Sequence, residues 1–168
     1  TKTPFGIDFG VGDVIVPKQE KRQIPTQLDD FSAPTVNTYS LETTIAEKID
    51  AILSLMEFSS RMKDYYDIYY LANKFDFDGA TLTEALRKTF ENRRHAFTVE
   101  QFEQVMAFDG DEAMQKKWKA FCRKIDTKTD DYGTVLKTIS DFLTKPFSAA
   151  ISSNNFSAKW HTDVCLWK

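Results

Sequence analysis

Apolar residues recur at helical spacing between residues 41 and 56, and this pattern constrains the fold more than any other feature. The repeating positions are Leu41, Ile45, Ile49, Ile52 and Met56. At about 3.6 residues per turn, these side chains fall on one face of a helix. Ser40 precedes them, and a serine hydroxyl at that place accepts a hydrogen bond from a free N–H of the first turn. The pattern therefore predicts a helix that begins after Ser40 and packs one face against a core.

Further segments show the same helical spacing, or the polar residues that begin a helix. The predicted helices cover residues 61–73, 81–92, 98–105, 111–124 and 134–143. Residues 58–60 form a short joint, so we expect the first two helices to be neighbours. Proline lacks a backbone N–H and is disfavoured inside a helix, so we expect Pro146 to end the last one.

Residues 5–16 alternate in the way that is typical of a β-strand. One face is almost entirely glycine and carries the carboxylate of Asp8, whereas the other face is apolar. Glycine in a strand often marks a place where a ligand or another backbone comes close. Pro17 is expected to end the strand. Residues 18–34 are expected to form a polar connection, with a short strand near its end.

These elements predict an α+β fold that is predominantly α, with one or two N-terminal strands followed by a bundle of about six helices. We divide the chain into the end of a sheet with its connecting loop (1–38), a helical domain (39–150) and a polar, aromatic tail (151–168). The tail either adds a short edge strand or contacts a partner. The chain has 14 phenylalanines, which favours an aromatic core over an exposed stacking surface.

Composition limits the class of protein. The 168 residues, of which 42% are hydrophobic, are enough for one domain with a real core. The net charge of -3 argues against a broad nucleic-acid-binding surface, and we expect Arg93-Arg94-His95 to be a solvated helix end. No apolar run approaches the roughly 20 residues of a membrane helix, so we expect no membrane contact. Two cysteines do not make a disulfide framework, which favours the cytoplasm.

Lys48 borders the apolar stripe of the first predicted helix. One interpretation is that its stem covers the core while its ammonium reaches water, as lysines often do at such positions. The other is that its ammonium is a fixed cation aimed at the oxygens of a triphosphate, a role that suits a compact point charge. The spacing alone leaves both open.

Asp64 and Asp67 share one face of the second predicted helix with residues that are expected to be buried. One interpretation is local pairing with Arg61 or Lys63, helped by a place in the first turn. The other is that a carboxylate on a packing face holds Lys48 from the neighbouring helix, or accepts from a substrate hydroxyl. Both interpretations stay open at this point.

Asp8 adds a third carboxylate, on the predicted strand. Magnesium prefers oxygen ligands, so Asp8 is a candidate metal ligand. One carboxylate does not make a site, because phosphoryl-type transfer usually relies on two metals held by several carboxylates. If Asp8, Lys48, Asp64 and Asp67 meet in one cleft, that cleft suits a metal-bound nucleoside triphosphate (NTP).

Three segments in this order resemble the AbiEii/AbiGii toxin family of nucleotidyltransferases, the toxin halves of type IV toxin–antitoxin and phage-abortive systems. The first is Ile7–Asp13, the second is Tyr39–Glu42 with Ala46–Lys48, and the third is Arg61–Leu71. The resemblance is close between residues 5 and 71. It is looser over the helices near the C-terminus. The combination of segments is fairly specific, although any one of them alone is weak.

The resemblance implies a role for each candidate residue. Asp8 corresponds to a catalytic carboxylate on the central sheet and to a metal ligand, and Lys48 to the lysine that contacts the triphosphate. Asp64 or Asp67 corresponds to the helical aspartate that completes the site. The implied reaction is attack by an acceptor hydroxyl on the α-phosphorus of an NTP with Mg²⁺, and pyrophosphate leaves. The implied acceptor is a tRNA 3′ end or a protein side chain, and the implied protein partner is an antitoxin.

Members of the family carry a Gly-Gly-Ser/Thr motif and an Asp-x-Asp pair in their first half, and these hold the phosphates and metals. The segment ahead of Asp8 contains neither. We therefore expect that an N-terminal portion is missing, and that this chain alone does not transfer nucleotides. The rival interpretation is a non-catalytic helical protein-interaction module. In that module Lys48 and Asp67 form a structural ion pair.

Overall fold

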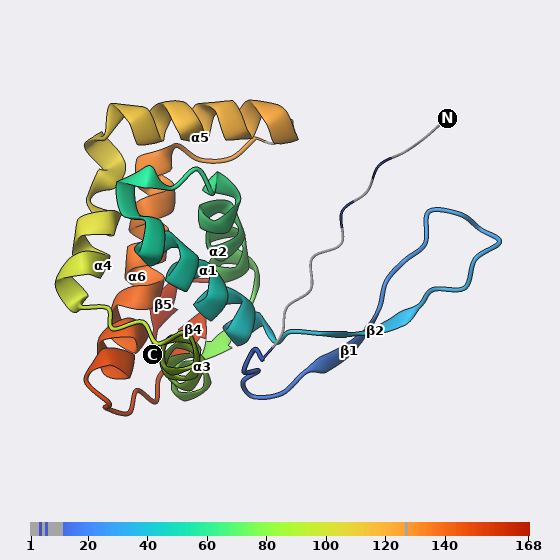
Figure 1. The fold of residues 1–168 in the computed structure, drawn as a ribbon, viewed down its shortest axis with the longest axis horizontal. Helices are drawn as coiled ribbons and strands as arrows, with labels where there is room; N and C mark the ends of the chain where they lie inside the picture. The colour runs from blue at the N-terminus through green and yellow to red at the C-terminus, as the bar shows by residue number, and fades with distance from the viewer. Residues whose placement is uncertain (1–3, 5, 7–11, 127) are drawn as a thin grey trace.

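The computed structural model describes residues 4, 6, 12–126 and 128–168. The helices are α1 (Leu41–Leu55), α2 (Met62–Lys74), α3 (Gly79–Arg93), α4 (Val99–Met106), α5 (Glu112–Ile125) and α6 (Tyr132–Ile151). The strands are β1 (Glu20–Gln23), β2 (Thr35–Thr38), β3 (Phe77–Asp78), β4 (Lys159–His161) and β5 (Leu166–Trp167). An N-terminal strand pair followed by six helices confirms the predicted α+β, predominantly helical fold (Figure 1).

Polar side chains begin five of the helices, because each accepts a hydrogen bond from a backbone N–H three residues further on. These caps are Ser40, Asp78, Thr98, Asp111 and Asp131. The backbone N–H of Thr98 in turn donates to the side-chain oxygen of Gln101, which makes a capping box. The caps that are visible in the sequence explain why most predicted helices begin within a few residues of the observed ones.

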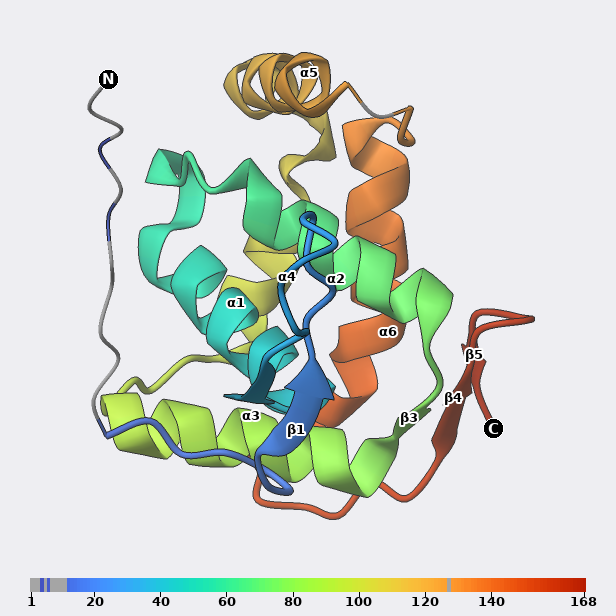
Figure 2. The same cartoon turned by 90° about the vertical axis from the view of Figure 1, so that its right-hand side faces the viewer.

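The core lies between α6 and the helices around it. α6 packs against α2, α3 and α4, while α1 packs against α2 and α3, and α5 lies across one end of the bundle (Figures 1 and 2). The largest fully buried side chains are aromatic: Trp160, Tyr65, Phe102, Phe142 and Phe147. Among the phenylalanines that the structure describes, five are buried in the core and three are exposed, so the expected aromatic interior is present.

The prediction that Pro146 ends the last helix is wrong. α6 continues through Pro146 to Ile151. A proline inside a helix leaves the carbonyl four residues earlier without its usual N–H partner, and here that carbonyl belongs to Phe142. The indole N–H of Trp167, on β5, donates to the Phe142 carbonyl at 2.8 Å. The tail therefore supplies the hydrogen bond that proline removes, which no local pattern around Pro146 could reveal.

The prediction of a strand over residues 5–16 is wrong for residues 12–16. Residues 5 and 7–11 lie outside the described residues, and residues 12–16 form no strand. The backbone N–H of Val16 donates to the hydroxyl of Thr43 at 2.8 Å, and its carbonyl accepts from the hydroxyls of Ser40 and Thr43. Side chains from the first turn of α1 thus make the hydrogen bonds that a neighbouring strand would have made.

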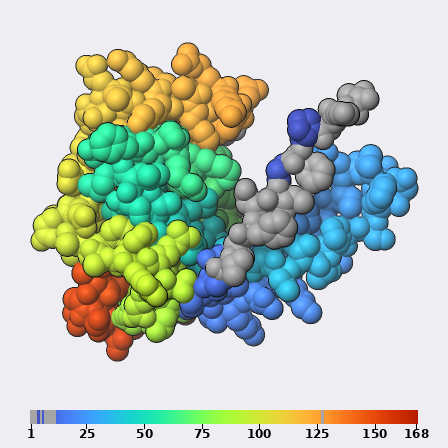
Figure 3. All heavy atoms as spheres, in the orientation of Figure 1, coloured from blue at the N-terminus to red at the C-terminus, as the bar shows by residue number. Residues whose placement is uncertain are grey.

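The N-terminal strands are instead β1 and β2, which pair antiparallel with Glu20 opposite Thr38. β1 lies within the segment that we expected to be a connection. The hairpin extends away from the helices (Figures 1 and 3), and its loop exposes Ile24, Leu28 and Phe31. None of the helices that the structure describes has the length and apolar character needed to cross a bilayer.

A second sheet, with strand order β3-β4-β5, joins the tail to the helical body. Its strands are antiparallel, with Phe77 opposite Trp160 and Trp160 opposite Trp167. The indole N–H of Trp160 donates to the carbonyl of Ala72 at 2.7 Å. Of the two possibilities left open for the tail, the structure therefore shows short strands.

Candidate functional site

Helices α1 and α2 bring three of the four predicted site residues together. The Lys48 ammonium lies 3.0 Å from a carboxylate oxygen of Asp64 and 2.6 Å from one of Asp67. One turn of 3₁₀ helix (Met56–Phe58) and a short joint separate the two helices, so their side chains meet across a narrow seam. The expected convergence of Lys48, Asp64 and Asp67 is thus present in the structure.

Two further cations stand at the rim of this seam. The Arg61 guanidinium pairs with Asp64, and the Lys63 ammonium pairs with Asp67 at 2.6 Å. We call Lys48, Arg61, Lys63, Asp64 and Asp67 the α1–α2 cluster. The side chain of Asp64 is 6% exposed and that of Lys48 is 18% exposed, whereas Arg61 is 55% exposed. The inner residues are therefore shielded from water while the rim cations are open to it.

The carboxylates keep Lys48 charged. Burial of Lys48 disfavours its charged form and lowers the pKa, but the contacts with Asp67 and Asp64 outweigh burial and raise the pKa above the ordinary value of 10.5. A lysine ammonium has three N–H groups. Asp64 and Asp67 occupy two directions around it, which leaves one N–H for a further acceptor.

Both interpretations offered for the two aspartates occur at once. Asp64 and Asp67 pair locally with Arg61 and Lys63, and they also hold Lys48 across the helix seam. The snorkelling interpretation of Lys48 does not describe its ammonium, because two carboxylates contact it. Contact with a substrate remains a prediction for all three residues.

The fourth predicted residue, Asp8, lies outside the described residues. Within the described part of the chain, no group of three or more His, Cys, Asp or Glu side chains could hold a metal ion. Asp64 and Asp67 each already contact two cations, so they do not offer magnesium a set of free oxygen ligands. The described residues alone therefore do not fit a magnesium site.

Two Asp-x-Asp spacings occur further along the chain, at Asp76/Asp78 and Asp109/Asp111. Asp78 and Asp111 are the N-caps of α3 and α5. The carboxylate of Asp76 accepts from the backbone N–H and hydroxyl of Thr162. Each of these two pairs has at least one carboxylate that already serves a helix start or a turn, so neither pair replaces the metal-binding pair expected ahead of Asp8.

A second ion cluster lies on another face of α1 and was missed in the sequence. The Asp50 side chain is 1% exposed, and its carboxylate contacts His95 Nδ1 at 2.8 Å and the Arg93 guanidinium at 3.3 Å. Arg93 also pairs with Glu47. We call Glu47, Asp50, Arg93 and His95 the α1–α3 cluster. Arg93 and His95 are nevertheless exposed, each with 37% of its side chain accessible, and α3 ends at Arg93, so the predicted solvated helix end is present. The sequence did not predict the contacts of Arg93 and His95 with α1.

Burial is the largest influence on Asp50 and raises its pKa, while the hydrogen bond and charge interaction with His95 lower it in part. The signal that could have revealed this cluster is the polar Asp50 within an apolar stretch of α1, between Ile49 and Ile52. A carboxylate at a buried position needs a partner. The sequence does not say that this partner comes from the end of α3.

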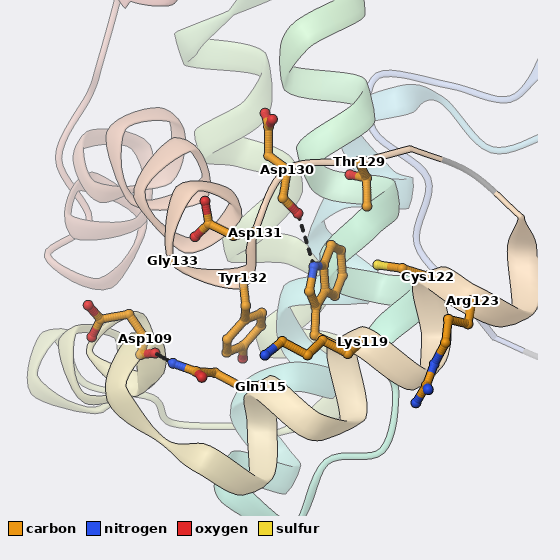
Figure 4. A pocket seen from close by; sticks show the side chains of 11 residues that line it. Asp109, Gln115, Lys119, Cys122, Arg123, Thr129, Asp130, Asp131, Tyr132 and Gly133 are labelled. Atoms are coloured by element: carbon orange, nitrogen blue, oxygen red, sulfur yellow. Dashed lines mark hydrogen bonds between the residues drawn. The ribbon is translucent and has the colours of Figure 1, made fainter.

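A pocket of about 750 Å³ lies elsewhere, between α5 and the start of α6. Figure 4 shows Lys119 and Arg123 extending from α5, across from Asp130 and Asp131. The indole N–H of Trp118 donates to the Asp130 carbonyl at 3.1 Å. No residue of the α1–α2 cluster lines this pocket, and its walls mix cations with carboxylates. We therefore do not assign triphosphate binding to it.

Comparison with known families places this geometry in context. A family model described as the nucleotidyl transferase AbiEii toxin of a type IV toxin–antitoxin system matches residues 1–152. The chain belongs to the AbiEii family. Searches among curated proteins and among solved structures gave no match. The AbiEii match includes every residue of the α1–α2 cluster, and it ends just after α6.

Membership confirms the resemblance noted in the sequence. The AbiEii family is one of nucleotidyl transferase toxins, and a type IV toxin–antitoxin system implies an antitoxin as partner. The family match assigns no role to single residues. The roles of Asp8, Lys48, Asp64 and Asp67 in this AbiEii chain are therefore predictions.

Proposed function

We propose that this chain acts in the transfer of a nucleotide from an NTP to a hydroxyl group of RNA or protein, and that Lys48 binds the triphosphate. The observation that carries the proposal is the Lys48 ammonium held between Asp64 and Asp67, with Arg61 and Lys63 at the rim. An ammonium fixed by two carboxylates is pre-oriented, so it loses little freedom when it takes a further acceptor.

The charge of the α1–α2 cluster favours a phosphate ligand. It contains three cations and two carboxylates, so one positive charge is left after pairing. Phosphate oxygens accept strong, charge-assisted hydrogen bonds from lysine and arginine. The exposed Arg61 and Lys63 side chains are free to swing towards an entering anion, while the inner Lys48 remains in place.

In the proposed reaction, the acceptor oxygen forms a bond to the α-phosphorus as the bond between that phosphorus and the β-phosphate oxygen breaks. Pyrophosphate leaves with the electron pair of the broken bond, and the proton of the acceptor hydroxyl passes to solvent water. Negative charge grows on the leaving pyrophosphate, and a fixed cation there stabilises the transition state. We propose this role for Lys48. Asp64 and Asp67 orient Lys48 and keep it protonated.

We further propose that Asp8 is a ligand of Mg²⁺, and this proposal rests on the family resemblance alone. We also propose that the reaction takes place in the cytoplasm. Because the described residues do not form a magnesium site, we route no step of the reaction through the metal. For the same reason we propose that this chain is inactive alone. Incubation with labelled NTP and Mg²⁺ is expected to label neither the protein nor added RNA, and robust labelling would contradict this expectation.

Nucleotide-dependent stabilisation tests the binding role of Lys48. A ligand that binds only the folded protein raises its melting temperature. We expect NTP with Mg²⁺ to raise the melting temperature of the wild-type protein, and Lys48→Met to lose this response. Lys137→Met is a matched control, because Lys137 also pairs with an aspartate but is 76% exposed on α6.

The same experiment separates the proposal from the rival, a non-catalytic helical interaction module. In the rival case, Lys48→Met lowers the melting temperature equally with and without nucleotide. A wild-type protein that does not respond to any NTP would contradict the proposed function.

A further inference from the structure

Lys117 of α5 reaches the joint between α1 and α2. Its ammonium donates to the carbonyl oxygens of Glu57 at 3.1 Å and Ser59 at 2.9 Å, and it contacts the sulfur of Met114 at 3.8 Å. The Lys117 side chain is half-buried. The two carbonyls belong to the only stretch of chain that connects the helices of the α1–α2 cluster, so Lys117 joins a third helix to that connection.

The joint contains a residue in an unfavourable backbone conformation and follows a helix end that has no cation of its own. Met56, where α1 ends, has φ 49° and ψ −133°, a backbone conformation that side-chain-bearing residues rarely adopt. The last turn of α1 contains no basic residue, although a cation there would stabilise the carbonyl end of the helix. Lys117 provides a cation at this end from a different helix.

The joint also sets where α2 begins. Ser59 is fully buried, and its hydroxyl accepts from the backbone N–H of Arg61 at 3.2 Å. The backbone N–H of Asp64 then donates to the carbonyl of Arg61 at 2.9 Å. Hydrogen bonds at Ser59 and Arg61 therefore link the Lys117 contact to the first turn of α2, which carries Asp64.

We infer that Lys117 is a positioning residue for the Lys48–Asp64–Asp67 arrangement, acting by clamping the α1–α2 joint. The inference deepens the proposed function and rests on it where nucleotide binding is concerned. Lys117 makes no ion pair with the cluster and touches it only through the joint. Without the clamp, the joint relaxes from its unfavourable backbone conformation and α2 moves relative to α1. A shift of that kind weakens a site that depends on close placement.

The test uses the full chain in two measurements. The first is the ¹H–¹⁵N signal of the Lys48 ammonium, which is assigned by its loss in Lys48→Met and which reports the contacts with Asp64 and Asp67. The second is the affinity for NTP with Mg²⁺. The variants are Lys117→Met, Lys117→Arg, which restores the two donors, and the control Lys116→Met. Lys116 is adjacent but is 80% exposed and pairs only with Glu112.

We expect Lys117→Met to move the Lys48 signal towards that of an unpaired lysine, and to weaken nucleotide binding on the order of tenfold. Lys117→Arg is expected to restore both, and Lys116→Met to change neither. A Lys48 signal that stays at its wild-type position in folded Lys117→Met overturns the inference. If Lys117→Met does not fold, the Lys48 signal is measured in Lys117→Gln, which keeps an N–H donor without the charge. A shift towards the signal of an unpaired lysine then supports the inference, and an unmoved signal overturns it. Absence of nucleotide binding to the wild type contradicts the proposed function alone.

Discussion

Helix α1 carries two ion clusters on different faces, and they differ in the balance of their charges. The α1–α2 cluster surrounds a lysine with two carboxylates and adds two rim cations. The α1–α3 cluster surrounds a buried carboxylate, Asp50, with one arginine and one histidine, and adds a second carboxylate, Glu47. The first has one more cation than carboxylates, whereas the second, with two carboxylates against Arg93 and His95, has no excess of cations.

This difference separates a cluster that can accept an anion from one that only joins helices. A phosphate entering the α1–α2 cluster meets one uncompensated positive charge and a free N–H of Lys48. A phosphate entering the α1–α3 cluster meets a carboxylate that arginine and histidine already satisfy. We therefore assign ligand binding to the first cluster and helix attachment to the second.

The largest expected effect on stability follows from Asp64→Ala. Asp64 is 6% exposed and contacts both Lys48 and Arg61, so its removal leaves a shielded ammonium with one carboxylate. We expect a loss of about 3 kcal/mol in the free energy of unfolding, measured with urea. In the control Asp141→Ala, which removes an exposed ion pair with Lys137, the loss should be within about 0.5 kcal/mol. Equal losses in the two variants would mean that burial does not set the strength of the α1–α2 cluster.

Asp50→Asn is expected to cost about 1.5 kcal/mol in the free energy of unfolding, because charge-assisted bonds to Arg93 and His95 are replaced by weaker ones. The melting-temperature response to NTP should be unchanged, since Asp50 is outside the α1–α2 cluster. Loss of the nucleotide response in a folded Asp50→Asn protein would contradict the assignment of ligand binding to the α1–α2 cluster and of helix attachment alone to the α1–α3 cluster.

A double apolar replacement, Lys48→Met with Asp64→Leu, tests whether the α1–α2 cluster serves ligand binding or stability. Replacing both members of a buried ion pair by apolar residues is often neutral or stabilising. We expect a free energy of unfolding within about 1 kcal/mol of the wild type, because Asp67 keeps Lys63 as a partner. The nucleotide response should be absent. A stable double variant that still responds to NTP would show that Lys48 does not bind the triphosphate.

The smallest expected effect is a dependence on alkaline pH. The pKa of Lys48 is raised in the folded protein, so its contribution to stability is present below the unfolded pKa of 10.5 and is lost as the pH rises through the folded value. The difference in unfolding free energy between wild type and Lys48→Met should therefore shrink at high pH. Tyr69, whose pKa is raised to about 12 by burial and by its bond to Asp130, titrates in both proteins and cancels. A difference that grows with pH would contradict the ion pairing.

The local part of the fold could be predicted from the sequence, and the long-range part could not. Apolar spacing and Ser40 were sufficient for α1, and the capping residues were sufficient for the starts of α4 and α5. The continuation of α6 through Pro146 depends on Trp167, which becomes a neighbour only when the tail folds back. The hydrogen bond from the Val16 backbone N–H to the Thr43 hydroxyl depends in the same way on how the chain enters α1.

The candidate site likewise has contacts that the sequence predicts and contacts that it does not. Lys48, Asp64 and Asp67 could be predicted to meet because a short joint makes α1 and α2 neighbours, and two carboxylates share one helix face. The pairing of Asp50 with His95 depends on where α3 crosses α1, which apolar spacing does not specify. The contact of Lys117 with the joint has no sequence signal, because it joins a side chain to backbone carbonyls.

NMR titration of the lysine ammonium signals shows whether the Lys48 ammonium contacts the triphosphate. Adding NTP with Mg²⁺ to the full-length protein is predicted to shift the Lys48 signal saturably, while the signal of Lys137, an exposed lysine paired with Asp141, stays in place. A Lys48 signal that remains unmoved while the nucleotide is shown by calorimetry to be bound would mean that Lys48 does not contact the triphosphate.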